Sequence, residues 1–248
     1  IARRTGARLH LVHCFEPPLP PLYSGGGAAY DPQLDRMLRD EKAAYLARVA
    51  DRVQRTCGVA VRTELLSPPT VPTLVSYASD AEVDLIVMTT HGRGGISRAW
   101  LGSVADALVR RTSVPVLLLR PRDEEVVITC EPQTSHMLIP LDGSELSEGI
   151  LAPAIGLAQL SGAHVTLLQV IEPQQSSGDS AAARRSALSY LEGIAREYMS
   201  GLEVDVAVEE HESPAVAILE YAALHGADLI ALATHGRGGW SRVALGSV

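Results

Sequence analysis

The feature that most constrains this chain is a long internal repeat. The stretch DLIVMTTHGRGGISRAWLGSV, residues 84–104, returns 144 positions later as DLIALATHGRGGWSRVALGSV, residues 228–248, with 15 of 21 positions identical. A shorter match lies upstream, where TGA at residues 5–7 precedes the apolar run LHLVH and SGA at residues 161–163 precedes VTLLQV. The chain therefore builds one kind of structural unit twice.

Short apolar runs alternate with helical stretches in both repeats. The runs are LHLVH, VDLIVM and PVLLL in the first repeat and HMLIP, VTLLQV and ADLIAL in the second. Continuous apolar runs of this length are typical of parallel strands covered on both faces. They predict two tandem α/β domains, each a doubly wound parallel sheet of Rossmann-like type. We place the domains at residues 1–122 and 135–248, with a linker over residues 121–135.

One long amphipathic helix is expected in each repeat. In the first, Asp31 is the expected N-cap, Pro32 stands in the first turn and Gly58 ends the helix in a left-handed conformation. The residues expected on its buried face are Leu34, Leu38, Tyr45, Val49 and Val53. The helix of the second repeat ends near Gly201, and its expected buried residues are Leu188, Leu191, Ile194 and Tyr198.

Aligning the repeats predicts that both are incomplete. Ile1 aligns with Leu157, whereas the first strand of the second repeat begins near Met137, so the first repeat lacks about 20 residues of strand and helix. The second repeat stops at Val248, the equivalent of Val104, and lacks a counterpart of residues 105–120. We expect a fragment of a longer protein.

Charge and cysteine content exclude several classes of protein. The net charge of -8 and the pI near 5.5 do not suit a nucleic-acid binder, which needs clustered Lys and Arg. Cys14, Cys57 and Cys130 are odd in number and lack the spacing of a zinc site, so we expect free thiols. No apolar run reaches the roughly 20 residues of a membrane span. A cytoplasmic protein is the expectation.

A glycine-rich motif follows the repeated strand. Nine residues separate Gly92 from the pair Gly102-Ser103, and nine separate Gly236 from Gly246-Ser247. Glycines let backbone N–H groups approach phosphate oxygens closely. Ser103 is the expected cap of a helix over residues 104–111, whose first amides would favour an anion. The motif therefore predicts a phosphate site at the end of a strand.

These residues resemble the universal stress proteins. ATP-binding members of that family carry G-x-x-G, nine residues and then Gly-Ser or Gly-Thr, together with an early strand followed by Asp and Ser, here LIPLDGSELSE at residues 138–148. The resemblance covers nearly the whole chain. It implies the adenine nucleotide alpha hydrolase-like form of the fold and ATP as ligand, alone or with Mg²⁺.

The resemblance also assigns residues to the ligand. Pro140 and Asp142 would line the adenine and ribose end, and Val170 would contact the adenosine. The residues that would hold ribose and phosphates in the second repeat are His235, Gly236, Gly246, Ser247 and Val248. The corresponding residues of the first repeat are Cys14, Thr89, His91, Gly92, Gly102, Ser103 and Val104.

Some positions depart from the family pattern and leave alternatives open. Thr89 and Ala233 replace the first Gly of the motif, so a nucleotide-free scaffold of the same fold is one alternative. A slow ATPase is another, although the chain has no Walker lysine and no G-x-S-x-G elbow, and we expect no enzyme. Asp142 could instead act only as a turn residue. The resemblance further implies pairing of the two repeats with each other, through strands such as PVLLL, and formation of a homodimer.

Overall fold

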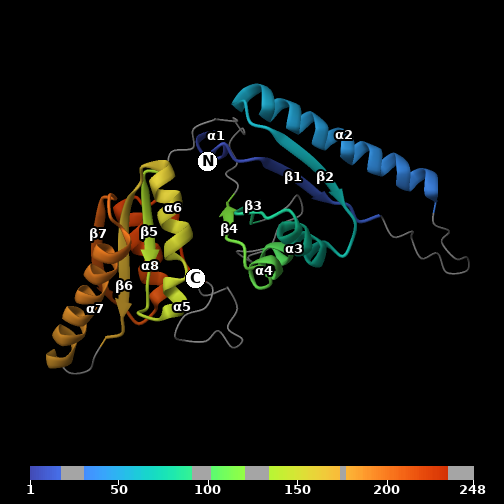
Figure 1. The fold of residues 1–248 in the computed structure, drawn as a ribbon. Helices are drawn as coiled ribbons and strands as arrows, with labels where there is room; N and C mark the ends of the chain where they lie inside the picture. Colours follow the sequence, from blue (N-terminus) through green and yellow to red (C-terminus); the bar gives the residue numbers. More distant parts are fainter. Residues whose placement is uncertain (18–30, 91–101, 121–133, 174–176, 234–248) are drawn as a thin grey trace, which may run out of the picture. The chain divides into compact units, whose positions relative to one another are not determined.

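The computed structural model describes residues 1–17, 31–90, 102–120, 134–173 and 177–233. The chain divides into two compact units, Ala2–Cys130 and Glu131–Val248. In each unit, helices alternate with strands, and every strand pair is parallel (Figure 1). The α/β class and the parallel sheets predicted from the apolar runs are confirmed.

The second unit contains a four-stranded sheet in the order β7-β6-β5-β8. Its strands are β5 (His136–Pro140), β6 (His164–Ile171), β7 (Val204–Glu210) and β8 (Leu229–Ile230). The chain moves outward from β5 to β7 and then crosses to the other side of β5 to form β8. The order of the strands therefore reverses between β5 and β8, and open α/β sheets bind their ligands at the carboxyl ends of such a pair.

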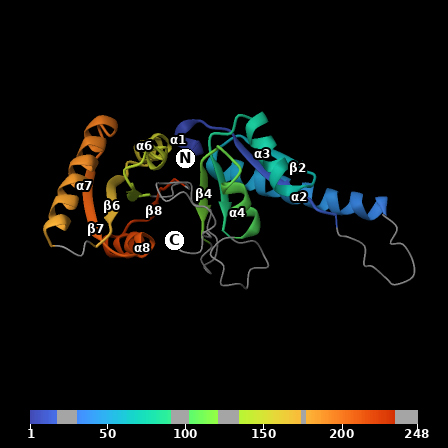
Figure 2. The ribbon, with the colours of Figure 1, turned by 90° about the horizontal axis from the view of Figure 1, so that it is seen from below.

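Helices cover both faces of this sheet (Figure 2). Helices α6 (Leu151–Ser161) and α7 (Ser177–Tyr198) pack on one face, and α8 (Pro214–His225) packs on the other. The larger core lies under α6 and α7 and includes Met137, Ile139, Val165, Leu167 and Leu191, all fully buried. The smaller core lies under α8, around Leu138, Leu168 and Ala222. Covering both faces explains why the strand sequences are continuously apolar.

The buried face of α7 differs from the expected one at its last turn. Leu191 and Ile194 are buried and Leu188 is partly buried, as predicted. Tyr198, however, is 46% exposed, and Met199 is buried after the helix ends. The helix stops at Tyr198 and the chain turns at Gly201, where φ is +84°, so the last buried position shifts by one residue.

The first unit contains two separate strand pairs. Strand β1 (Leu9–Cys14) pairs with β2 (Val61–Leu66), and β3 (Ile86–Thr89) pairs with β4 (Val116–Leu119). Its helices are α1 (Ala2–Thr5), α2 (Pro32–Cys57), α3 (Thr70–Asp80) and α4 (Ser103–Val109). By the repeat, β1 corresponds to β6 and β3 to β8, and in the second unit β5 lies between those two strands. The described residues of the first unit include no counterpart of β5, which leaves its sheet as two pairs.

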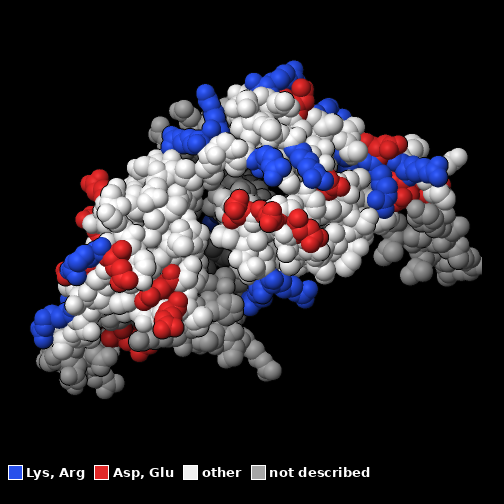
Figure 3. All heavy atoms as spheres, in the orientation of Figure 1, with Lys and Arg blue, Asp and Glu red and all other residues white. Residues whose placement is uncertain are grey.

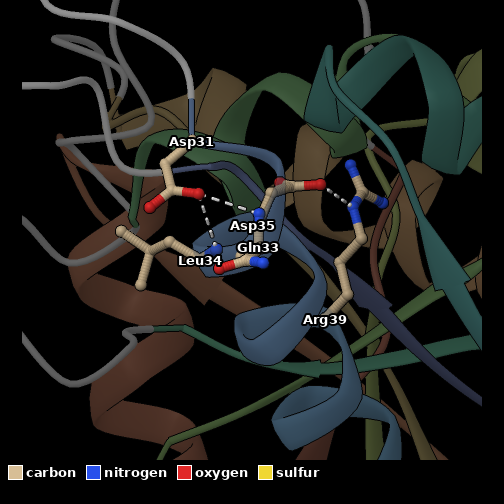
Figure 4. A network of polar contacts seen from close by, with 5 residues as sticks. All are labelled: Asp31, Gln33, Leu34, Asp35 and Arg39. Carbon is tan, nitrogen blue, oxygen red and sulfur yellow. Dashed lines mark hydrogen bonds and ion pairs between the residues drawn. The ribbon is translucent and has the colours of Figure 1, made fainter.

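Helix α2 begins and ends as predicted. The Asp31 carboxylate accepts hydrogen bonds from the backbone N–H groups of Gln33 and Leu34 at 2.9 and 3.3 Å (Figure 4). At the other end, Gly58 has φ +65°, a left-handed conformation that costs residues with a Cβ more than glycine. The local signals for the ends of a helix are sufficient here because each acts within one turn.

The buried face of α2 was predicted in part: Leu38, Val49 and Val53 are partly buried, as expected, but two other positions differ. Leu34 and Tyr45 are each 47% exposed, whereas their neighbours Asp35 and Leu46 are buried. Asp35 is tolerated in the interior because Arg39, one turn later, donates to its carboxylate at 2.8 Å (Figure 4). Arg39 also lies 5.0 Å from the centre of the Phe15 ring, which anchors this charged pair on an apolar side chain.

The described surface carries both signs of charge. On the face drawn in Figure 3, Lys and Arg side chains are interspersed with Asp and Glu. None of the helices in the described ranges combines the length and the apolar character that crossing a membrane requires. Neither Cys14 nor Cys57 forms a disulfide with another described residue, and Cys130 lies outside the described residues.

Candidate ligand site

The most distinctive loop of the second unit follows β5. Leu141 N–H donates to Leu168 O at 2.8 Å, which extends the β5–β6 ladder by one bond, and Asp142 comes directly after it. On the other side of β5, Ala231 N–H donates to Leu138 O at 2.9 Å, and Ala233 follows two residues later. Asp142 and Ala233 therefore leave the carboxyl ends of two neighbouring strands, at the point where the strand order reverses.

The Asp142 carboxylate is held by its own loop. Its Oδ1 accepts hydrogen bonds from the N–H of Ser144 at 2.9 Å and from the Ser144 hydroxyl at 2.5 Å. Gly143 between them has φ +77°, which favours glycine. Ser144, not Asp142, caps the short helix α5 (Glu145–Glu148), because its hydroxyl accepts from the N–H of Ser147 at 3.2 Å.

Pro140 and Val170 lie at the same end of the sheet, on neighbouring strands. Val170 packs against the smaller core, on the α8 face. Pro140 lies two residues after Leu138, a member of that core, and alternation along a strand places both on one face. The structure thus brings an apolar strand end next to the Asp142 loop.

A tyrosine and a glutamate beside this loop were not predicted from the sequence. The Tyr190 hydroxyl of α7 donates to Glu148 Oε1, at the end of α5, at 2.8 Å. Burial, the Glu148 carboxylate and the charge of Asp142 raise the pKa of Tyr190, while a hydrogen bond from Ser147 acts in the opposite direction. The hydroxyl therefore stays protonated and acts as a donor at neutral pH. The two residues are 42 positions apart, so no local pattern joins them.

In the first unit, the described site residues gather at the end of β3. Gly102 N–H donates to Thr90 O at 2.7 Å, which joins the carboxyl end of β3 to the start of α4. Thr89, Gly102, Ser103 and Val104 are thereby brought to one place. The predicted cap at Ser103 is wrong: Gly102 is the N-cap, no side chain caps the helix, and α4 covers Ser103–Val109. Helix α4 therefore begins one residue earlier than expected, at Ser103, and it buries Ala105 and Leu108.

The remaining predicted residues are distributed as follows. Cys14 is the last residue of β1, in the other strand pair of the first unit, and is partly buried. The predicted site residues that lie outside the described part of the chain are His91, Gly92, His235, Gly236, Gly246, Ser247 and Val248. Their role stays a prediction.

A second polar cluster lies at the opposite, amino end of the second unit's sheet. His136 Nδ1 lies 3.1 Å from His225 O, and its Nε2 lies 2.8 Å from the hydroxyl of the buried Thr166. His164 lies beside His136 and contacts the Asp205 carboxylate at 3.1 Å. These contacts tie β5, β6, β7 and the end of α8 together. In the part of the chain that the structure describes, no group of three acidic, histidine or cysteine residues is arranged to hold a metal.

Known proteins resemble this chain in sequence and in fold. The model of the universal stress protein family matches residues 1–120 and 134–248. Universal stress protein Rv2005c of Mycobacterium tuberculosis is 33% identical over 214 residues, which cover 83% of this chain and 69% of that protein. Universal stress protein Rv2623 of the same species is 28% identical over 259 residues, 97% of this chain and 81% of its own.

A solved structure extends the likeness to the fold. The crystal structure of a universal stress protein from Archaeoglobus fulgidus superposes with a TM-score of 0.60 at 19% identity, covering 84% of this chain and 69% of that chain. Two matched segments in one chain agree with the internal repeat. The chain therefore belongs to the universal stress protein family, with two family domains in tandem, and this membership supports a role in the stress response.

Proposed function

We propose that this chain is a nucleotide-binding regulatory module whose second unit binds ATP at the carboxyl end of its sheet, around Asp142. The observation that carries the proposal is the position of Asp142. Its loop leaves the sheet where the strand order reverses, and its carboxylate is fixed by two hydrogen bonds from Ser144. A fixed carboxylate at such a point is suited to accept hydrogen bonds from ribose hydroxyls.

The surrounding residues fit an adenosine. Pro140 and Val170 provide apolar surface on the α8 face, beside the carboxylate. A pocket with apolar walls and a few fixed polar groups is the usual way in which proteins bind such a ligand. In this proposal the phosphates are held by Gly236, Gly246 and Ser247, and in the first unit by their counterparts Gly92, Gly102 and Ser103. Mg²⁺ would accompany the phosphates and would be held chiefly by their oxygens.

Calorimetric titration of ATP into the protein tests the proposal. Asp142→Ala removes hydrogen bonds to a charged acceptor, and we expect its Kd at the second unit to rise by about tenfold or more. Asp205→Ala is a matched control, because that aspartate belongs to the same unit but lies at the opposite end of the sheet and is 74% exposed. The control should bind ATP as the wild type does.

Two other outcomes correspond to the alternative functions. The protein could give no heat with ATP and release no nucleotide when it is denatured. That result would contradict the proposal and indicate a nucleotide-free scaffold. Phosphate release that exceeds that of a His91→Ala, His235→Ala variant would instead indicate a slow ATPase. Binding without phosphate release is the result that the module requires.

A further inference from the structure

The Asp142 loop is attached to the rest of the second unit through α5. Ser144 begins that helix and also donates to Asp142. Ser147, which is buried, donates from its hydroxyl to Ser144 O at 2.8 Å and accepts from the N–H of Asp142 at 3.4 Å. Any shift of α5 therefore moves Ser144, whose N–H and hydroxyl hold the Asp142 carboxylate, and Ser147, which contacts the Asp142 backbone.

Helix α5 is only four residues long and cannot hold its own position. Glu148, its last residue, accepts the hydrogen bond from Tyr190 at 2.8 Å. The backbone at Tyr190 is held in place, because the next residue, Leu191, is fully buried against the sheet. The contact thus joins a short helix to one that is anchored by its core.

The first repeat preserves the same pair of residues. Helices α2 and α7 hold the same place in the two repeats, and each contains a Tyr-Leu pair, Tyr45-Leu46 and Tyr190-Leu191. Leu46 is buried, as Leu191 is, but Tyr45 is 47% exposed. The described residues of the first unit include no counterpart of α5. Packing alone accounts for the leucine in both repeats. Tyr190, in contrast, has its hydrogen-bond acceptor in α5.

We propose that Tyr190 is a positioning residue for the ligand site: its hydrogen bond to Glu148 holds α5 so that Ser144 and Ser147 keep the Asp142 carboxylate ready for the nucleotide. This inference rests on the proposed function. A tyrosine hydroxyl is protonated at physiological pH even without a shift, and burial and the Glu148 carboxylate raise the pKa of Tyr190 further, so the group remains a donor. Tyr190 itself need not touch the nucleotide.

Tyr190→Phe tests this role, because it removes the hydroxyl and keeps the ring. Without ATP, the amides of Ser144 and Ser147 should exchange hydrogen about fivefold faster, as expected for the loss of one such bond. The Kd for ATP should rise by about the same factor. Tyr198→Phe is the control on the same helix, because Tyr198 is about half exposed and lies at the last residue of α7, and it should change neither quantity.

Two substitutions of Glu148 separate positioning from charge. Gln keeps an acceptor oxygen, so Glu148→Gln should keep the Kd within about twofold of the wild type, whereas Glu148→Ala should weaken ATP binding as Tyr190→Phe does. Unchanged exchange and unchanged Kd in Tyr190→Phe would overturn the inference and leave the ATP site intact. Faster exchange with an unchanged Kd would also overturn it, since Tyr190 would then serve only the fold. Absence of ATP binding in the wild type would refute the proposed function itself.

Discussion

Single residues decide how the chain starts, turns and stops its helices. Asp31 and Gly58 were predicted correctly for α2, because a cap and a left-handed glycine act through the nearest backbone groups. Gly6 and Gly162 turn the chain in the same left-handed way at equivalent points of the two repeats, with φ +67° and +70°. Ser103, in contrast, was predicted as the cap of α4 and is not the cap. Gly102, the residue before it, takes the cap position, and no side chain caps α4.

The cap at Asp31 gives a stability prediction at this scale. Asp31→Ala leaves the N–H groups of Gln33 and Leu34 without their acceptor, and it should lower the free energy of unfolding by about 1 kcal/mol. Urea denaturation followed by circular dichroism measures this change. Asp51→Ala in the same helix removes only an exposed ion pair with Arg55 and should cost less than about 0.5 kcal/mol. Equal effects of the two substitutions would contradict the assigned cap.

At the scale of elements, the sequence predicted the strands well and the rotation of the helices less well. The apolar runs identified all the strands that carry the candidate site, because a strand buried on both faces has little freedom in composition. The long helices of the two repeats were expected to bury Tyr45 and Tyr198, and both are about half exposed. Which side of a helix packs on the sheet depends on contacts between elements, such as that of Arg39 with Phe15. The periodicity of apolar residues along one helix does not reveal such contacts. Tyr190 and Glu148 were missed for the same reason.

Two substitutions in α7 test which side of this helix is buried. Leu191→Ala removes a fully buried side chain from the larger core and should lower the free energy of unfolding by about 2–5 kcal/mol. Tyr198→Ala, at the position wrongly expected to be buried, should change it by less than about 0.5 kcal/mol. Chemical denaturation of both variants provides the comparison. A larger loss for the tyrosine would mean that α7 is rotated from its assigned position.

At the scale of the whole molecule, the internal repeat is the most informative feature of the sequence. It predicts tandem α/β domains, and the family match over both segments agrees with that prediction. The repeat also explains how the two units differ. In the second unit β5 joins β6 to β8, whereas the described part of the first unit has two strand pairs and no such central strand. The carboxyl end of β5, with Asp142, is consequently described in the second unit alone, and the account of ATP binding depends on that end of the sheet.

Hydrogen exchange measured by mass spectrometry, with and without ATP, tests this central claim most directly. At an ATP concentration about 100 times the Kd, exchange in residues 141–147 should slow by up to about 100-fold, because the bound state must release its ligand before the loop opens. Exchange at the opposite end of the sheet, around His136 and Asp228, should not change, and at the same ATP concentration Asp142→Ala should reduce the slowing by about tenfold because it binds ATP more weakly. Slowing confined to that opposite end, or no slowing at saturating ATP, would contradict the account.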